Sequence, residues 1–82
     1  MIFTWTAVSG GGKRLKVDGR SVDIVIIYRP RPKQWRVYRR SMKDVLTTSG
    51  IKLFFSNKLL STGSPDQEQA KDIAIAIWRM KV

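Results

Sequence analysis

Residues 24–28, Ile-Val-Ile-Ile-Tyr, form the segment that most constrains how this chain can fold. Successive side chains of a β-strand point to opposite faces, so this run places apolar groups on both faces of a sheet. Its residues are also strong strand formers. We therefore predict that residues 21–28 form a central strand that is covered on both sides.

Shorter strands are predicted on either side of this segment. Residues 1–8 and 15–17 alternate in polarity with period two, and the second of these runs ends at Asp18-Gly19, a strong signal for a tight hairpin turn. The glycines of residues 9–12 supply a flexible turn between them. Residues 35–40 alternate again, and the proline-containing loop 29–32 separates them from the central strand as a hairpin.

The region from residue 41 to residue 63 carries weaker signals. Residues 41–51 fit a short capped helical turn, but Val45 and Thr47 are poor helix formers, so a loop or an irregular strand fits equally well. Residues 52–55 and 59–61 flank Ser56-Asn57-Lys58, where we predict a second tight hairpin. Thr62-Gly63 is expected to end the β portion.

A helix is predicted to begin at Pro65. Ser64 can cap it, proline suits the first helical position, and Asp66 and Gln67 complete the first turn. One face of this helix is apolar, because apolar residues recur at helical spacing: Ala70, Ile73, Ala74, Ile77 and Trp78. Three more apolar residues, Ile75, Ala76 and Met80, widen this face into a surface that a homodimer could cover.

Together these elements predict an α+β fold. We expect a small curved antiparallel sheet or meander of about four to six short strands, with one amphipathic C-terminal helix packed on one face. A chain of 82 residues has room for one domain, made of a β portion at 1–63 and a helix at 64–82. Trp5, Trp35 and Trp78 are expected in its core, because each lies on the larger apolar face of its element.

The residue types that the chain lacks exclude several classes of catalytic and metal site. The chain has no His and no Cys, which excludes an imidazole base, a thiolate nucleophile, a disulfide and a Cys-ligated zinc. Three of the six carboxylates belong to the first half of the helix, where capping explains them. We therefore expect a binding protein without catalytic residues, metal or cofactor, and we retain a metal-independent ribonuclease as a lesser alternative.

The chain carries 16 Lys and Arg against 6 Asp and Glu, a formal charge of +10, and this charge is unevenly distributed. Residues 1–63 hold all of the excess, whereas residues 64–82 are balanced. Residues 29–43 contain seven cations and one carboxylate follows only at position 44. An exposed strand face usually mixes both signs, because like charges repel. A polyanionic partner is therefore predicted.

Nucleic acid, DNA or RNA, is the partner that we expect, bound mainly through its phosphates. If Trp35 and Val37 face the helix, then Arg36, Tyr38 and Arg40 project from the opposite face of their strand. Tyr38 would then either stack on an unpaired base or cover a sheet edge. The predicted binding residues are Lys13, Arg14, Lys16, Arg29, Arg31, Lys33, Arg36, Tyr38, Arg40 and Lys43.

An acidic protein is the alternative partner, in which case the chain would act as a small interaction or inhibitor protein. No membrane partner is expected, because the longest apolar runs fall far short of the roughly 20 residues that span a bilayer. The first eight residues are also too short for the apolar region of a signal peptide. We expect a soluble intracellular protein, cytoplasmic or associated with a nucleoid or nucleus. Single and double strands are both left open.

Overall fold

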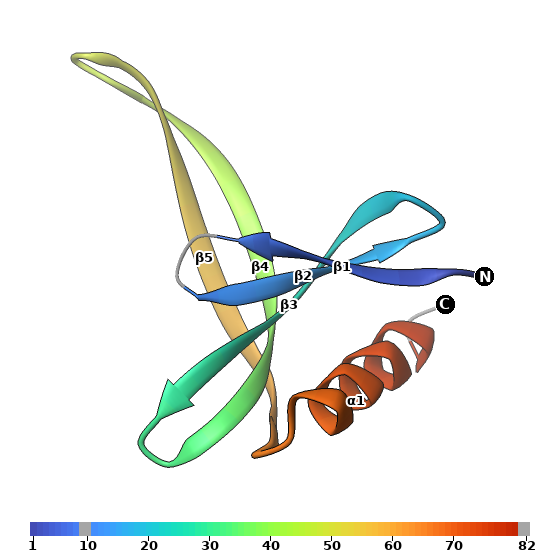
Figure 1. The fold of residues 1–82 in the computed structure, drawn as a ribbon. Helices are drawn as coiled ribbons and strands as arrows, with labels where there is room; N and C mark the ends of the chain where they lie inside the picture. Colours follow the sequence, from blue (N-terminus) through green and yellow to red (C-terminus); the bar gives the residue numbers. More distant parts are fainter. Residues whose placement is uncertain (9–10, 81–82) are drawn as a thin grey trace.

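A computed structural model describes residues 1–8 and 11–80, and leaves the side chains of 42–45 and 52–55 undescribed. Its sheet is a meander in strand order β1-β2-β3-β4-β5, every neighbouring pair being antiparallel (Figure 1). The α+β prediction is thus confirmed. The elements are β1 (Phe3–Val8), β2 (Gly12–Val17), β3 (Arg20–Pro30), β4 (Lys33–Thr47), β5 (Gly50–Ser64) and α1 (Gln67–Met80).

The Asp18-Gly19 turn is confirmed in detail. Asp18 and Gly19 both have positive φ angles, 51° and 81°, as the hairpin turn that matches strand twist requires. Asp18 also ties down the start of the chain: its Oδ1 accepts from the backbone N–H of Ile2 at 2.8 Å, and its own N–H donates to the Ile2 carbonyl at 2.8 Å. This turn therefore fixes both the β2–β3 register and the beginning of β1.

The β3–β4 hairpin is tighter than predicted. Its turn consists only of Arg31 and Pro32, joined by a cis peptide bond, because Arg29 and Pro30 continue β3 and pair with Gln34 and Lys33. Proline is tolerated at a strand end, where few ladder hydrogen bonds are required of it.

The predicted hairpin at Ser56-Asn57-Lys58 is wrong. The turn lies at residues 48–49, and β5 runs without interruption past Asn57, which pairs with Arg40. Of the alternatives for residues 41–51, the strand is the correct one. Strand β4 therefore supplies a pairing partner for each residue of the predicted turn at 56–58. The Thr47 hydroxyl closes the actual turn by donating to the Gly50 carbonyl at 2.8 Å.

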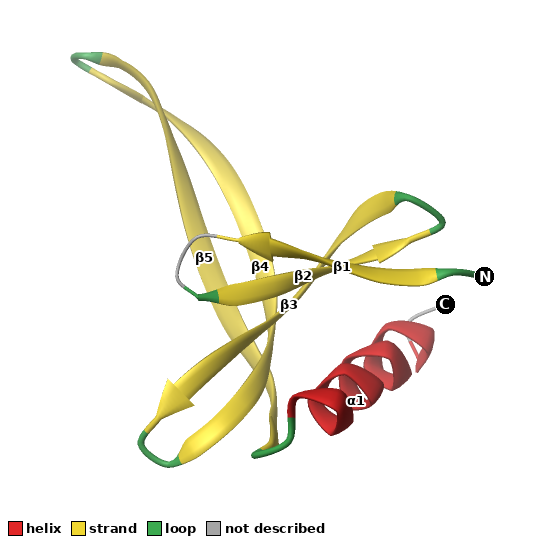
Figure 2. Cartoon of the chain, viewed as in Figure 1, coloured by secondary structure: helices red, strands yellow, loops and turns green. Residues whose placement is uncertain are grey.

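The distal half of the β4–β5 hairpin projects from the rest of the molecule, as Figure 2 shows. We call residues 41–56 the arm. Its strands pair in unbroken register from Ser41 and Ser56 to the turn. Helix α1 lies across the opposite end of the sheet, next to β3, β4 and β5.

The core lies between α1 and one face of the sheet. Ile24, Ile26, Val37 and Ala74 are fully buried there. The side chains packed against them include all three tryptophans, Trp5, Trp35 and Trp78, which confirms the expected core placement. Residues predicted for the apolar helix face, Ala70 and Ala74 among them, are the ones that α1 buries.

Helix α1 begins at Gln67, two residues later than predicted. Asp66 caps it, since its Oδ1 accepts from the backbone N–H of Glu68 at 3.2 Å and its carbonyl accepts from Ala70 at 3.0 Å. Ser64 is buried instead: its hydroxyl donates to Gln69 Oε1 at 2.8 Å and accepts from the Asp66 N–H at 3.1 Å.

Replacing the cap residue, Asp66→Ala, should lower the free energy of unfolding by about 1 kcal/mol, because one helical N–H loses its acceptor. Urea denaturation followed by circular dichroism measures the loss. Asp72→Ala, an exposed change within the same helix, is the control and should change stability by no more than about 0.5 kcal/mol. Equal losses in the two variants would contradict the capping role.

Candidate nucleic-acid interface

The sheet face opposite α1 collects most of the predicted binding residues. Cross-strand partners share a face, and the register places Arg14, Val25, Tyr38 and Leu59 in one row across β2 to β5. A second row contains Gly12, Ile27 and Arg36. We call this surface the open face. The predicted binding residues that lie on it are Arg14, Lys16, Arg29, Arg36, Tyr38 and Arg40.

An apolar cluster lies at the centre of the open face. Val25, Ile27 and Tyr38 are 0%, 2% and 8% exposed, although they lie on the side of the sheet away from α1. Arg14 and Arg36, both half-buried, are their register neighbours. Long arginine stems cover apolar surface while their charged ends stay near solvent. The prediction that the central strand is buried on both faces is therefore confirmed.

Arg29 and Tyr38 form a pair on this face. Arg29 Nε donates to the Tyr38 hydroxyl at 3.3 Å, and the guanidinium carbon lies 5.6 Å from the ring centroid. The ring is buried and engaged, so it offers no open face for a base to stack on. Of the two roles expected for Tyr38, covering the sheet is the one that its position supports, and it also holds Arg29 in place.

Arg14 and Arg36 are held without an anionic partner among the described side chains. Their Nε atoms are buried and have no hydrogen-bond partner within the described structure. The ion pairs found in that part of the chain join Arg39 to Asp23 and Lys71 to Glu68, so neither involves these two arginines. A buried donor without an acceptor costs about 1–3 kcal/mol.

At the base of the arm, in contrast to Arg14 and Arg36, two arginines have polar side-chain partners. Arg39 Nε lies 3.2 Å from Asp23 Oδ2, and Arg40 Nε donates to Asn57 Oδ1 at 3.1 Å. Asp23 therefore offsets the charge of Arg39, which is not among the predicted binding residues. The contact with Asn57 orients the guanidinium of Arg40 across β4 and β5.

The remaining predicted residues lie elsewhere. Arg31 and Lys33 are exposed at the β3–β4 turn. Lys33 pairs with Pro30 and lies two positions before Trp35, so the register places it on the α1 side of the sheet and not on the open face. Lys13, also a predicted binding residue, pairs with Ala7 and Ile26 and so lies on the face that α1 covers, opposite to Arg14. The side chain of Lys43 lies outside the described part of the structure.

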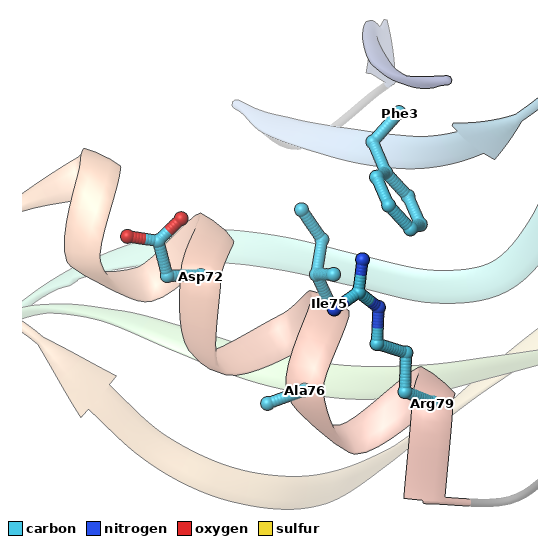
Figure 3. A pocket seen from close by; sticks show the side chains of 5 residues that line it. All are labelled: Phe3, Asp72, Ile75, Ala76 and Arg79. Atoms are coloured by element: carbon cyan, nitrogen blue, oxygen red, sulfur yellow. The ribbon is translucent and has the colours of Figure 1, made fainter. Parts of the chain in front are cut away.

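A shallow hollow lies between β1 and α1, away from the open face. Figure 3 shows Arg79 reaching from α1 toward Phe3, with its guanidinium carbon 5.2 Å from the ring centroid. Asp72 supplies the carboxylate of this hollow, and Ile75 and Ala76 complete the lining. Asp72 and Arg79 are the charged residues among the side chains that line the hollow.

Comparisons with protein-family models, curated proteins and solved structures find no match to this chain. What the open face can bind therefore follows from its own chemistry. The described residues contain no group of three or more acidic side chains able to hold a metal ion. Nor does any described helix have the length and apolar character needed to cross a bilayer.

The open face is suited to phosphate. Its cations come from three adjacent strands, β2, β3 and β4, so they are spread over a surface instead of following one line. Guanidinium groups donate two parallel hydrogen bonds to phosphate oxygens, and they are weakly hydrated compared with ammonium groups. Because Arg14 and Arg36 have packed stems, little conformational freedom is lost when an anion binds.

Proposed function

We propose that this chain is a nucleic-acid-binding protein whose open face contacts the phosphate backbone largely without regard to sequence, and that it carries out no catalytic step. One observation carries the proposal: Arg14 and Arg36 pack against an apolar cluster and take part in neither of the ion pairs of the described structure. The charge of +10 supports a polyanionic partner.

Backbone contact is favoured over base readout by the side chains available. Adenine is typically read by a free Asn or Gln amide, whereas the Asn57 oxygen on this surface is engaged by Arg40. The ring of Tyr38 is covered by Arg29. What the face presents is arginine and lysine, which position a backbone and contribute affinity that does not depend on sequence.

The test compares two charge-matched double variants. Arg14→Met with Arg36→Met removes the two guanidinium groups but keeps stems that cover Val25 and Ile27. Arg20→Met with Lys58→Met removes the same charge from exposed positions in register with Val17 and Arg39, outside the open face. Fluorescence anisotropy with labelled single- and double-stranded oligonucleotides at several salt concentrations measures affinity and its salt dependence.

We expect the open-face variant to bind at least about 10-fold more weakly and to reduce the slope of log K against log salt by about 1.8 on duplex DNA, as the loss of two phosphate contacts requires. The control should keep most of the wild-type slope. Equal losses in both variants would show that charge alone, and not this face, governs binding. Wild-type protein that binds no oligonucleotide at low salt would overturn the proposal and leave an acidic protein as the partner to pursue.

A further inference from the structure

The arm differs from the rest of the sheet in charge. Residues 41–56 contain Lys43, Asp44 and Lys52 as their only charged residues, a net charge of +1. The other residues of 1–63 carry a net +9. The arm is therefore the nearly neutral part of a strongly basic sheet. Phosphate binding by the open face does not explain why the arm lacks this positive charge.

The tip of the arm presents apolar side chains to solvent. Leu46 and Ile51 are direct cross-strand partners and are 81% and 72% exposed. Directly opposed residues lie on the same face of a hairpin, so they form one apolar pair. The Thr47 hydroxyl, which donates to the Gly50 carbonyl and lies 3.2 Å from the Ser49 hydroxyl, holds the turn that carries them.

The arm also includes an unpaired strand edge. Strand β5 ends the sheet order, so one side of its 15 residues has no neighbouring strand among the elements that the structure describes. Such an edge displays backbone N–H and C=O groups that can pair with another chain. By sequence, the arm further contains Met42, Val45, Leu53, Phe54 and Phe55. An isolated two-stranded hairpin of this kind is marginally stable in water unless something packs on it.

We propose that the arm is the contact surface of a homodimer, in which the arms of two copies pack against each other. Charge selects a second copy as the occupant: nucleic acid or an acidic surface would favour the +9 body, whereas contact between two nearly neutral arms keeps the two basic bodies far apart. A twofold axis lets one apolar surface serve both copies. This inference does not depend on the proposed nucleic-acid binding.

The oligomeric state of the full chain is the test. Sedimentation equilibrium should give twice the chain mass of 9.4 kDa. Leu46→Ser with Ile51→Ser should raise the dimer dissociation constant by at least about 100-fold, because four apolar side chains leave the contact. Met80→Ser removes an equally exposed apolar side chain from α1, at 83% exposure, and should leave the dimer intact.

A salt series separates arm contact from bridging by bound nucleic acid. At about 1 M salt, where the screening length is about 3 Å, bridged copies dissociate while an apolar arm contact persists. Because the chain has no Cys, Thr48→Cys places one spin label at the tip, and pulsed electron resonance should detect a short distance between the tips of two copies.

Three outcomes would overturn the inference. The first is wild-type protein that remains a monomer at about 1 mM, a concentration at which even weak specific dimers form. The second is a dimer that dissociates at about 1 M salt. The third is a dimer broken by Met80→Ser and unaffected by the tip variant, which would assign the contact to α1. Circular dichroism on all variants confirms that each is folded.

Discussion

Gly63→Ala is expected to abolish the folded state. Gly63 has a φ angle of +67°, and a Cβ added there would overlap the carbonyl oxygen of Trp35 and come within 2.9 Å of its carbonyl carbon. Both obstacles are backbone atoms of the neighbouring strand, so no side-chain rotation relieves them. The register between β4 and β5 shifts at Trp35, Val37 and Tyr38, and Gly63 is what allows β5 to cross this irregularity so closely.

The expected loss exceeds about 4 kcal/mol, because β5 has to separate from β4 in addition to adopting a disfavoured backbone angle. A domain of this size has a total stability near 5 kcal/mol, so thermal melting should show no cooperative transition. Gly19→Ala is the matched control. Its φ is +81°, but an added Cβ meets nothing within 4 Å, and it should lose only about 1–2 kcal/mol. Similar melting curves for both variants would contradict the close approach of β5 to Trp35.

Ala74→Asp is expected to destabilise the folded state nearly as much as Gly63→Ala. Ala74 is fully buried, with 0% of its surface accessible, and it packs with Ile24, Ile26 and Val37. A carboxylate in that position would be buried without a cation to pair with, and the free energy of unfolding at pH 7 should fall by more than about 4 kcal/mol. Ala76→Asp, on an exposed position of the same helix, should lose about 0.5–1 kcal/mol, mainly through helix propensity.

The pH dependence of the free energy of unfolding provides a second measurement for the Ala74→Asp variant. Burial would raise the pKa of the introduced carboxyl in the folded state above its unfolded value of about 3.9. Between those two values the unfolded chain is ionised while the folded chain keeps the proton, so stability falls as pH rises. The difference between Ala74→Asp and wild type in urea denaturation should therefore be smaller near pH 4 than at pH 7. A difference that grows toward low pH would show that the site is not buried.

Where local signals and burial agree, the fold could be predicted from the sequence. Residues 24–28 specify a doubly covered strand on hydrophobicity alone, and Asp18-Gly19 specifies its turn through backbone preference. The arm could not be predicted in the same way. Asn57 is a good turn residue, but its side chain contacts Arg40 across the ladder, so pairing with β4 overrides a local preference. Gly50, next to the true turn, was equally consistent with the end of a short helix.

For the candidate site, too, the local pattern could be predicted and the contacts between strands could not. Alternation along β4 placed Arg36 and Arg40 opposite Trp35 and Val37, because the period of a strand is fixed. Lys13 was grouped with Arg14 by closeness in sequence, although adjacent strand residues face opposite ways. The contact of Arg29 with Tyr38 spans two strands and depends on their register. Sequence patterns identify the face of a residue more readily than they identify its partner.

The strand order carries a consequence for how the chain acquires its structure. Each strand pairs only with the strands next to it in sequence, so the sheet can form by successive hairpins while synthesis proceeds from the N-terminus. The face that carries Ile24, Ile26 and Val37 is covered only when α1 arrives, and α1 also reaches back to Phe3 through the edge-on contact of Trp78 at 5.9 Å. Until α1 has left the ribosome, a formed sheet exposes its apolar side. Aggregation during synthesis, more than slow pairing of strands, is the hazard that this topology creates.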